Sequence, residues 1–195
     1  MKTKTITLYE YDELPDNVKS KVLDELRYIN AEDSFWHDYD GKTGFTLAEL
    51  KRMKVEVKDA PDNLIKYKNI YFDLDARYIQ FTDAKFSNDE VARKFLRVPG
   101  KLWDNVHWTF VNKGFGGNRH NSTVIEYEPQ YYDKEFTPKQ VEILDRAAEI
   151  FSEKMEEALR NLRNQYEYLV TDEAIIETIE ANGYTFTITG KIENA

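Results

Sequence analysis

One glycine-rich segment, residues 113–121, combines the residue types that bind an anionic ligand. Its glycines let backbone N–H groups turn towards a ligand, while lysine, arginine and histidine side chains supply positive charge. Arg119 suits a bidentate contact with a phosphate or carboxylate, and Phe115 suits stacking on a base. The predicted ligand-binding residues are Lys113, Phe115, Gly116, Gly117, Asn118, Arg119 and His120.

The same segment also fits a simple hairpin loop between two strands. Glycine and asparagine adopt the positive φ angles that tight hairpins need. The segment does not match the Walker A loop, G-x-x-x-x-G-K-[ST], and the dinucleotide fingerprint requires a glycine loop that leads into a helix. A binding loop and a structural hairpin are both compatible with these residues.

Positive charge gathers around this loop, although the chain as a whole is acidic. The 195 residues carry 36 Asp+Glu against 27 Lys+Arg, a formal net charge of −9. Residues 91–123 hold six Lys and Arg but a single Asp, which gives this window +5 and leaves −14 elsewhere. The window predicts an anion-binding patch, with ordinary solvated faces as the alternative. The acidic remainder argues against non-specific binding to DNA.

Two acidic motifs are candidates for a metal site or a catalytic site. Residues 38–49 resemble a calcium loop, but Lys42 stands where an oxygen ligand belongs and Thr43 where glycine is needed. We therefore expect no metal there, and we assign Glu49 to a capping box with Thr46.

Asp73 and Asp75 lie on one face of a predicted strand. Together with Glu126 and Glu128 they could assist metal-dependent hydrolysis of a phosphodiester. Acids at a strand end beside a turn are, however, more often simply solvated. No nucleophile elbow or metalloprotease histidine motif is present. We predict no catalytic residues and no cofactor, and we expect a binding protein rather than an enzyme.

Composition excludes further classes of protein. Cysteine is absent, which removes disulfide scaffolds, thiolate zinc sites and cysteine nucleophiles. No stretch approaches the roughly 20 apolar residues of a membrane helix, and the first residues have no apolar signal core. These features predict a cytoplasmic protein that does not bind membranes.

The apolar periodicity predicts which elements position these residues. Strands are expected at residues 3–11, 70–74, 79–81, 106–110, 123–127 and 184–188, where apolar residues alternate. Helices are expected at 15–30, 33–39, 47–53, 87–96, 138–170 and 172–182. Residues 126–136 are the expected linker between the sheet region and the long helix. The glycine-rich loop then joins two neighbouring strands.

This order of elements predicts an α+β fold, a mostly antiparallel sheet packed against a long C-terminal helix and shorter helices. The expected organisation is one domain over residues 1–195, with sub-regions 1–135 and 136–195. The apolar stripe of the 138–170 helix can dock on the sheet or pair with a second copy, which leaves a homo-oligomer open.

Three segments resemble a widespread group of small acidic phage and prophage proteins. They are residues 9–38, with Tyr9-Glu-Tyr-Asp-Glu-Leu14 and Phe35-Trp-His-Asp38; the hairpin Ile70-Tyr-Phe-Asp-Leu-Asp-Ala-Arg-Tyr-Ile79; and the tail at residues 166–188. Residues 91–135 are not similar to that group. The group has no assigned biochemical activity, so the resemblance implies no site residues. It implies a mobile-element origin and action in the bacterial host cytoplasm.

The resulting hypothesis is a phage accessory protein that acts by binding and counteracts host antiviral defence. In one version the basic window sequesters an anionic, nucleotide-like signal. In the other, the acidic surface mimics nucleic acid and inhibits a host defence protein. A metal-dependent phosphodiesterase using Asp73 and Asp75 is the enzymatic alternative. The step from origin to anti-defence role is an analogy between proteins of similar origin.

Overall fold

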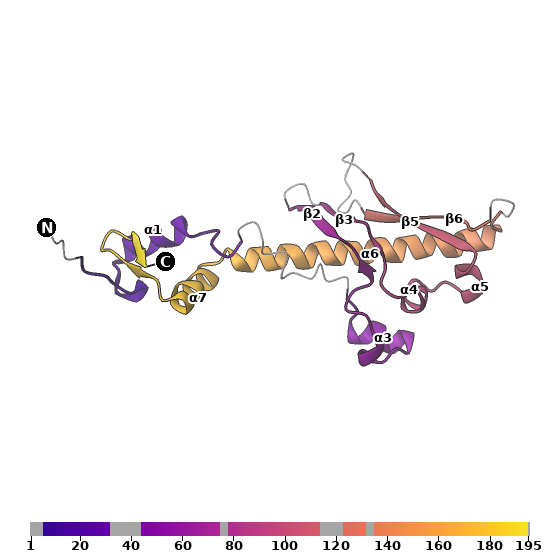
Figure 1. Ribbon diagram of the computed structural model, residues 1–195, viewed down its shortest axis with the longest axis horizontal. Helices are drawn as coiled ribbons and strands as arrows, with labels where there is room; N and C mark the ends of the chain where they lie inside the picture. Colours follow the sequence, from indigo (N-terminus) through magenta and orange to yellow (C-terminus); the bar gives the residue numbers. More distant parts are fainter. Residues whose placement is uncertain (1–5, 32–43, 75–77, 114–122, 132–134, 195) are drawn as a thin grey trace. The chain divides into compact units, whose positions relative to one another are not determined.

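The computed structural model describes residues 6–31, 44–74, 78–113, 123–131 and 135–194 (Figure 1). The chain divides into two compact units. The terminal unit contains residues 1–39 and 163–195, and the central unit contains residues 40–162. Helix α6 (Pro138–Leu169) contributes residues to both. Each unit is described by itself below.

The central unit is built from antiparallel β-ladders and helices, which confirms the predicted α+β class. Its described residues form three two-stranded ladders, and Figure 1 shows the last of them running alongside α6. They pair β1 (Ile65–Lys66) with β4 (Lys85–Phe86), β2 (Asn69–Asp73) with β3 (Tyr78–Thr82), and β5 (Val106–Asn112) with β6 (Thr123–Pro129).

The register of these ladders follows the predicted alternation. In β2–β3, Ile70 pairs with Phe81 and Phe72 with Ile79, and both Ile79 and Phe81 are buried. The two predicted strands on either side of the glycine-rich segment do form one hairpin, β5–β6. The predicted linker at 126–136 is wrong in its first part, because β6 continues to Pro129.

Short helices surround the ladders in the central unit. They are α3 (Leu47–Met53), α4 (Asp89–Leu96) and α5 (Gly100–Trp103), with a 3-10 turn at Val57–Asp59. The predicted capping box at Thr46 and Glu49 is confirmed, since each backbone N–H bonds to the other's side chain. Helix α4 begins two residues after the predicted start at 87, because Asn88 is its N-cap and accepts from the Val91 N–H.

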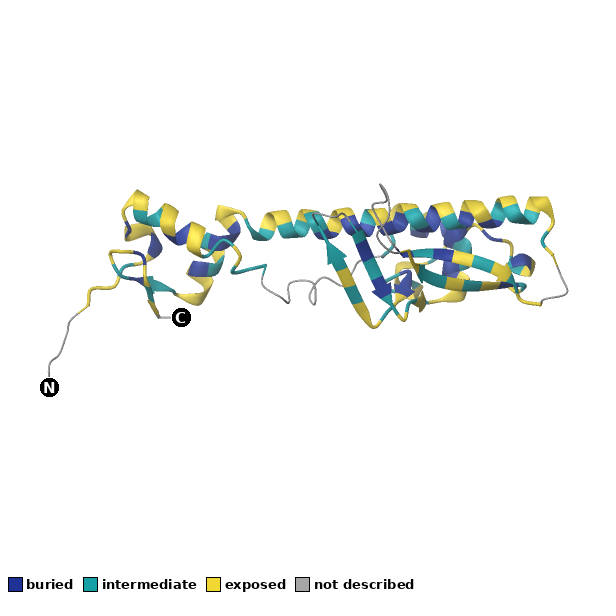
Figure 2. Ribbon diagram, turned by 90° about the horizontal axis from the view of Figure 1, so that it is seen from above, coloured by how far each residue is buried: buried dark blue, intermediate teal, exposed yellow. Residues whose placement is uncertain are grey.

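Helix α6 presents an apolar stripe to the hairpins of the central unit (Figure 2). The stripe is fully buried at Leu144, Phe151, Met155 and Leu162. Its N-terminus has a capping box, in which the Gln140 N–H bonds to Thr137 Oγ1 and the Thr137 N–H bonds to Gln140 Oε1. Docking within the chain therefore accounts for the stripe, and a homo-oligomer through this helix stays a prediction.

The terminal unit joins the two ends of the chain around one small core. It contains a 3-10 turn at Tyr11–Glu13, α1 (Asp16–Glu25), α7 (Asp172–Asn182), β7 (Thr185–Phe186) and β8 (Ile192–Asn194). Its buried side chains are Tyr11, Leu14, Val22, Leu23, Ile175, Ile179 and Phe186. Gly183 ends α7 in the left-handed conformation, with φ of 62°, as predicted.

Within its described part, residues 6–11, the predicted N-terminal strand is reduced to one residue. Tyr9 forms an isolated bridge with Phe186, and residues 6–8 have no regular structure. Helix α1 ends at Glu25 rather than at residue 30. The helix predicted at 33–39 lies outside the described residues. Across the parts of the chain that the structure describes, no helix has the length and apolarity to cross a membrane.

A buried lysine ties α3 to α6 inside the central unit. The Lys154 side chain is only 2% exposed, and its Nζ lies 3.3 Å from Glu49 Oε2 and 3.0 Å from Glu157 Oε2. The ammonium also lies 5.9 Å from the centroid of the Phe95 ring on α4. Burial raises the pKa of the Glu49 carboxyl, but the Thr46 N–H and the Lys154 charge outweigh it, so that pKa lies below its ordinary value.

Replacing Lys154 with alanine is expected to destabilise the protein by about 3 kcal/mol, because two partly buried carboxylates lose their counter-charge. Urea unfolding measures the effect. The control is Lys58→Ala, whose exposed pair with Glu56 should contribute less than about 0.5 kcal/mol. A Lys154→Ala protein as stable as the Lys58→Ala protein would show that the ion pair does not tie these helices together.

Candidate functional site

A groove of about 730 Å³ lies beside strand β5 in the central unit. One wall is the segment 81–86, which contains β4, and the other is β5 from Val106 to Phe110. Asp89 and Trp103 line it as well, and Asn112 lies at the start of the glycine-rich segment. We call this the aromatic groove. Its size is in the range of small-molecule sites, roughly 300–1,000 Å³.

Phe86 is the centre of the aromatic cluster that gives the groove its name. Its ring centroid lies 5.3 Å from that of Trp103, 6.2 Å from Trp108 and 5.0 Å from Phe110. Trp103 and Trp108 are 5.3 Å apart. The cluster rests on α6 through Phe151, 5.6 Å from Phe110. These rings are only half-buried where they line the groove, so they offer flat apolar surface to a ligand.

Two buried polar atoms of groove residues have no hydrogen-bond partner among the residues that the structure describes. They are the indole Nε1 of Trp108 and the hydroxyl Oγ1 of Thr82. The indole N–H can only donate, whereas the hydroxyl can donate and accept. A buried polar group without a partner costs about 1–3 kcal/mol, so a ligand that bonds to both atoms gains that energy on binding.

The main chain of β5 adds further polar groups at this edge. The Gln130 N–H bonds to the Asn105 carbonyl, which makes 105 and 130 a hydrogen-bonded pair of the antiparallel ladder. Because bonding alternates along such a ladder, the backbone groups of Trp108 and Phe110 point away from β6. Pro129, which has no N–H, occupies the corresponding outward position on β6.

A buried threonine holds the far end of the groove in place. Thr123 has no exposed surface, and its Oγ1 accepts the Phe81 N–H at 3.0 Å and lies 3.0 Å from Asn112 Oδ1. The Asn112 side-chain amide bonds in turn to the Phe81 carbonyl at 3.4 Å. This network fixes the two residues that bracket the glycine-rich segment against strand β3.

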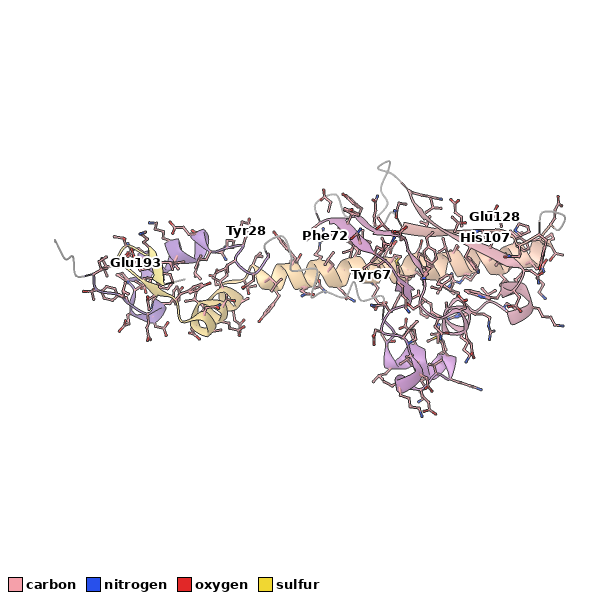
Figure 3. All side chains as sticks on the ribbon, viewed as in Figure 1. Tyr28, Tyr67, Phe72, His107, Glu128 and Glu193 are labelled. Carbon is pink, nitrogen blue, oxygen red and sulfur yellow. The ribbon has the colours of Figure 1, made fainter. Side chains whose placement is uncertain are left out.

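The charges at the groove are mixed. Lys85 and His107 line it beside Asp83 and Asp89. Asp83 is already neutralised by Lys68, whose Nζ lies 2.7 Å from its carboxylate. His107 lies opposite Glu128 across the ladder, and both side chains are labelled in Figure 3.

Only one of the predicted ligand-binding residues lies within the described part of the chain. Lys113 is exposed, and its Nζ lies 3.3 Å from Glu126 Oε1. The predicted residues outside the described ranges are Phe115, Gly116, Gly117, Asn118, Arg119 and His120.

Some residues of the two acidic motifs lie within the described part of the chain. Asp73 lies on β2 and Asp75 lies outside the described residues, as does the 38–43 part of the calcium-like motif. Glu126 pairs with Lys113, and Glu49 has the capping role predicted for it. Within the described residues, no three Asp, Glu or His side chains gather closely enough to hold a metal ion.

Three groove residues were missed by sequence reasoning. Trp103 and Phe86 were not singled out, and Thr82 carries no pattern that marks a binding residue. Trp108 lies in the strand predicted at 106–110, and its ring packs against other rings, but its indole N–H has no partner among the described residues. An unpartnered donor is a tertiary property, so no spacing in the sequence could reveal it.

Comparison with protein-family models, with curated proteins and with solved structures finds no match to this chain.

Tyr127 connects the aromatic cluster to α6, and the pKa of its hydroxyl is raised. Its ring lies 6.2 Å from Trp108, and its hydroxyl donates to Asp145 Oδ1 at 2.6 Å. Burial and this hydrogen bond to a carboxylate raise the pKa of Tyr127 to about 12.

The folded state therefore holds the Tyr127 proton between pH 10, the ordinary tyrosine value, and about pH 12. Stability contributed by this group is complete below pH 10 and is lost as the pH rises towards 12. A Tyr127→Phe variant is expected to lack one late-titrating phenol in a pH-jump absorbance titration recorded before unfolding. If the number of phenols that titrate near pH 12 is the same in the variant, the pKa of Tyr127 is not raised.

Proposed function

We propose that this chain is a binding protein whose aromatic groove takes the planar part of an anionic, nucleotide-like ligand. One observation carries the proposal: the groove is walled by half-buried aromatic rings, and two of its lining residues, Trp108 and Thr82, each hold a buried polar atom without a partner among the described residues. Flat apolar surface beside a few convergent polar groups is what a nucleobase requires. The groove also ends at Asn112, next to the segment predicted from the sequence to bind anions.

Each part of the groove has a role in this proposal. The rings of Trp103 and Phe110 stack on the base, an interaction of about 1–3 kcal/mol per base. The Trp108 N–H, the Thr82 hydroxyl and the outward backbone of β5 bond to its edge. Lys85 and Lys113, with Arg119 from the predicted loop, attract the phosphates. Nothing in this assignment requires a bond to be broken, so the ligand is held rather than converted.

The wider role rests on the resemblance to phage and prophage proteins. A protein that holds a nucleotide-like signal without turning it over would deplete that signal in the host cytoplasm. We propose that this depletion counteracts host antiviral defence. The phosphodiesterase alternative predicts instead that the nucleotide is hydrolysed in the presence of Mg²⁺ or Mn²⁺ and that a chelator stops the hydrolysis.

Isothermal titration against cyclic nucleotides and ADP-ribose derivatives tests the proposal. At least one of them is expected to bind with a stoichiometry of one per chain. Trp108→Phe keeps an aromatic ring but removes the N–H, so the affinity for that nucleotide should fall about three- to tenfold, the equivalent of one hydrogen bond.

Tyr71→Phe is the matched control, since Tyr71 is 55% exposed on β2 and does not line the groove. Its affinity should equal that of the unaltered chain. The absence of heat with every nucleotide, or an equal loss in both variants, would overturn the proposal.

The distribution of charge between the two units favours a second candidate function. The terminal unit has 15 Asp+Glu against 7 Lys+Arg, a net charge of −8, whereas the central unit has 21 against 20, a net charge of −1. Nearly all the excess negative charge thus belongs to 72 of the 195 residues. Such a body attracts a basic partner, as the protein-binding hypothesis requires.

Host proteins captured by the immobilised chain are expected to be basic and to be released as salt rises, because Debye screening weakens the attraction. Neutralising Asp16, Glu25 and Glu173 in the terminal unit to Asn or Gln should weaken capture. The control neutralises Glu142, Glu153 and Glu156, which are exposed in the central unit. Capture that is equal in the two triple variants would contradict this second candidate.

A further inference from the structure

The two walls of the aromatic groove are both edges of β-ladders. In the part of the chain that the structure describes, β5 pairs only with β6, and β4 pairs only with β1. Strand β5 forms one wall of the groove, and the segment that contains β4 forms the other. A strand with a single neighbour has main-chain donors and acceptors unused along its other edge. The groove is therefore bordered by two open strand edges.

The register of the two ladders shows which main-chain groups lie on these open edges. On β5 they belong to Trp108 and Phe110, whose backbone groups point away from β6. In the β1–β4 ladder the Ser87 N–H bonds to the Leu64 carbonyl, so the next pair along, at Phe86, is not hydrogen-bonded. The N–H and C=O of Phe86 therefore point away from β1. Within the described residues, these groups of Phe86, Trp108 and Phe110 have no hydrogen-bond partner.

The side chains along the two edges separate into an apolar face and a polar face. The ring of Phe86 contacts those of Trp108 and Phe110, so these three rings share one face of the two strands. Because successive side chains of a strand alternate, Lys85 and His107 belong to the opposite face. An extended segment between the edges would need apolar side chains towards the rings and polar side chains on the other face.

The polar face carries two lysines that repel each other. Lys66 and Lys85 lie directly opposite in the β1–β4 ladder, both are exposed, and neither forms an ion pair within the described residues. Like charges in this position destabilise a ladder. Of the acids that line the groove, Asp83 is paired with Lys68, and Asp89 belongs to the first turn of α4. A carboxylate on a strand added beside β4 would offset the repulsion, so the charge favours an acidic segment.

We propose that the groove is a slot for one extended strand of a partner polypeptide, in which apolar and acidic side chains alternate. The main chain of this strand pairs with β5 at Trp108 and Phe110 and reaches Phe86 on the other wall. Its apolar side chains pack on the rings, and its carboxylates lie beside Lys85. Every strand that the structure describes already uses one edge in its own ladder, so a segment with both edges free comes from another protein.

This inference goes beyond the proposed function and does not rest on it, although a nucleotide and a strand in the same groove would exclude each other. The probe is the acetylated and amidated peptide Thr-Val-Glu-Val-Glu-Val-Thr, added to the full chain. On binding, the amide N–H groups of Phe86, Trp108 and Phe110 gain carbonyl partners, so their hydrogen exchange measured by NMR should slow at least fivefold.

Two altered peptides separate the contributions of charge and main chain. The first has lysine in place of both glutamates, and the second carries a methyl group on the backbone nitrogen of the central valine. Each should bind at least fivefold more weakly than the probe, the first because it adds positive charge beside Lys85 and the second because it cannot donate a main-chain hydrogen bond.

Lys85→Gln should weaken binding of the probe at least threefold. Lys101→Gln is the matched control, since Lys101 is exposed on α5 and does not line the groove, and it should change the affinity less than 1.5-fold. Dispersed amide spectra confirm that both variants are folded.

Equal binding of the three peptides, or unchanged exchange at Trp108 and Phe110, would overturn the slot. Failure of the slot and failure of the proposed function give different results. Nucleotide binding without binding of the probe removes the slot and retains the proposed function. Binding of the probe with slowed exchange at these amides, but without nucleotide binding, does the reverse.

Discussion

The buried ammonium of Lys154 is the interaction on which the central unit depends. A charge that is 2% exposed is tolerated only with counter-charges at close range, and here Glu49 and Glu157 supply them. Glu49 also completes the cap of α3, so one carboxylate fixes both where that helix begins and how it attaches to α6. With Phe95 of α4 beside the same ammonium, three helices share this contact.

The arrangement of the rings in the aromatic groove depends on the position of α6. Phe151 lies one turn before Lys154 on that helix and packs against Phe110 and Phe86, the residues that orient the aromatic cluster. The cluster lies against the open edge of β5, and the two unpartnered polar atoms are buried in residues that line the groove. The ion pair and the groove are thus linked through successive residues of one helix, and α6 positions the binding surface without contributing to its lining.

Local patterns in the sequence predicted the elements, whereas the site depends on contacts that local patterns do not encode. The alternation at Val106, Trp108 and Phe110 and the capping box at Thr46 each involve residues within a few positions of one another, and both appear in the structure. The N-terminal strand is wrong over residues 6–11, because alternation indicates one buried face but not a pairing partner, and among these described residues only Tyr9 has one. The Phe86–Trp103–Trp108 cluster and the Lys154 ion pairs bring together residues from separate elements. The apolar pattern of a single segment cannot predict such contacts.

The net charge also differs between a window of the sequence and the compact unit to which that window belongs. Counted along the sequence, residues 91–123 are a basic window of +5 in an acidic chain. Counted by compact unit, that window belongs to a central unit of −1, in which Glu126 lies against Lys113. The excess negative charge instead lies in the unit formed by the two ends of the chain. A ligand at the groove therefore meets nearly balanced long-range charge and must be selected by stacking and hydrogen bonds, while a basic partner of the terminal unit is attracted before it makes contact.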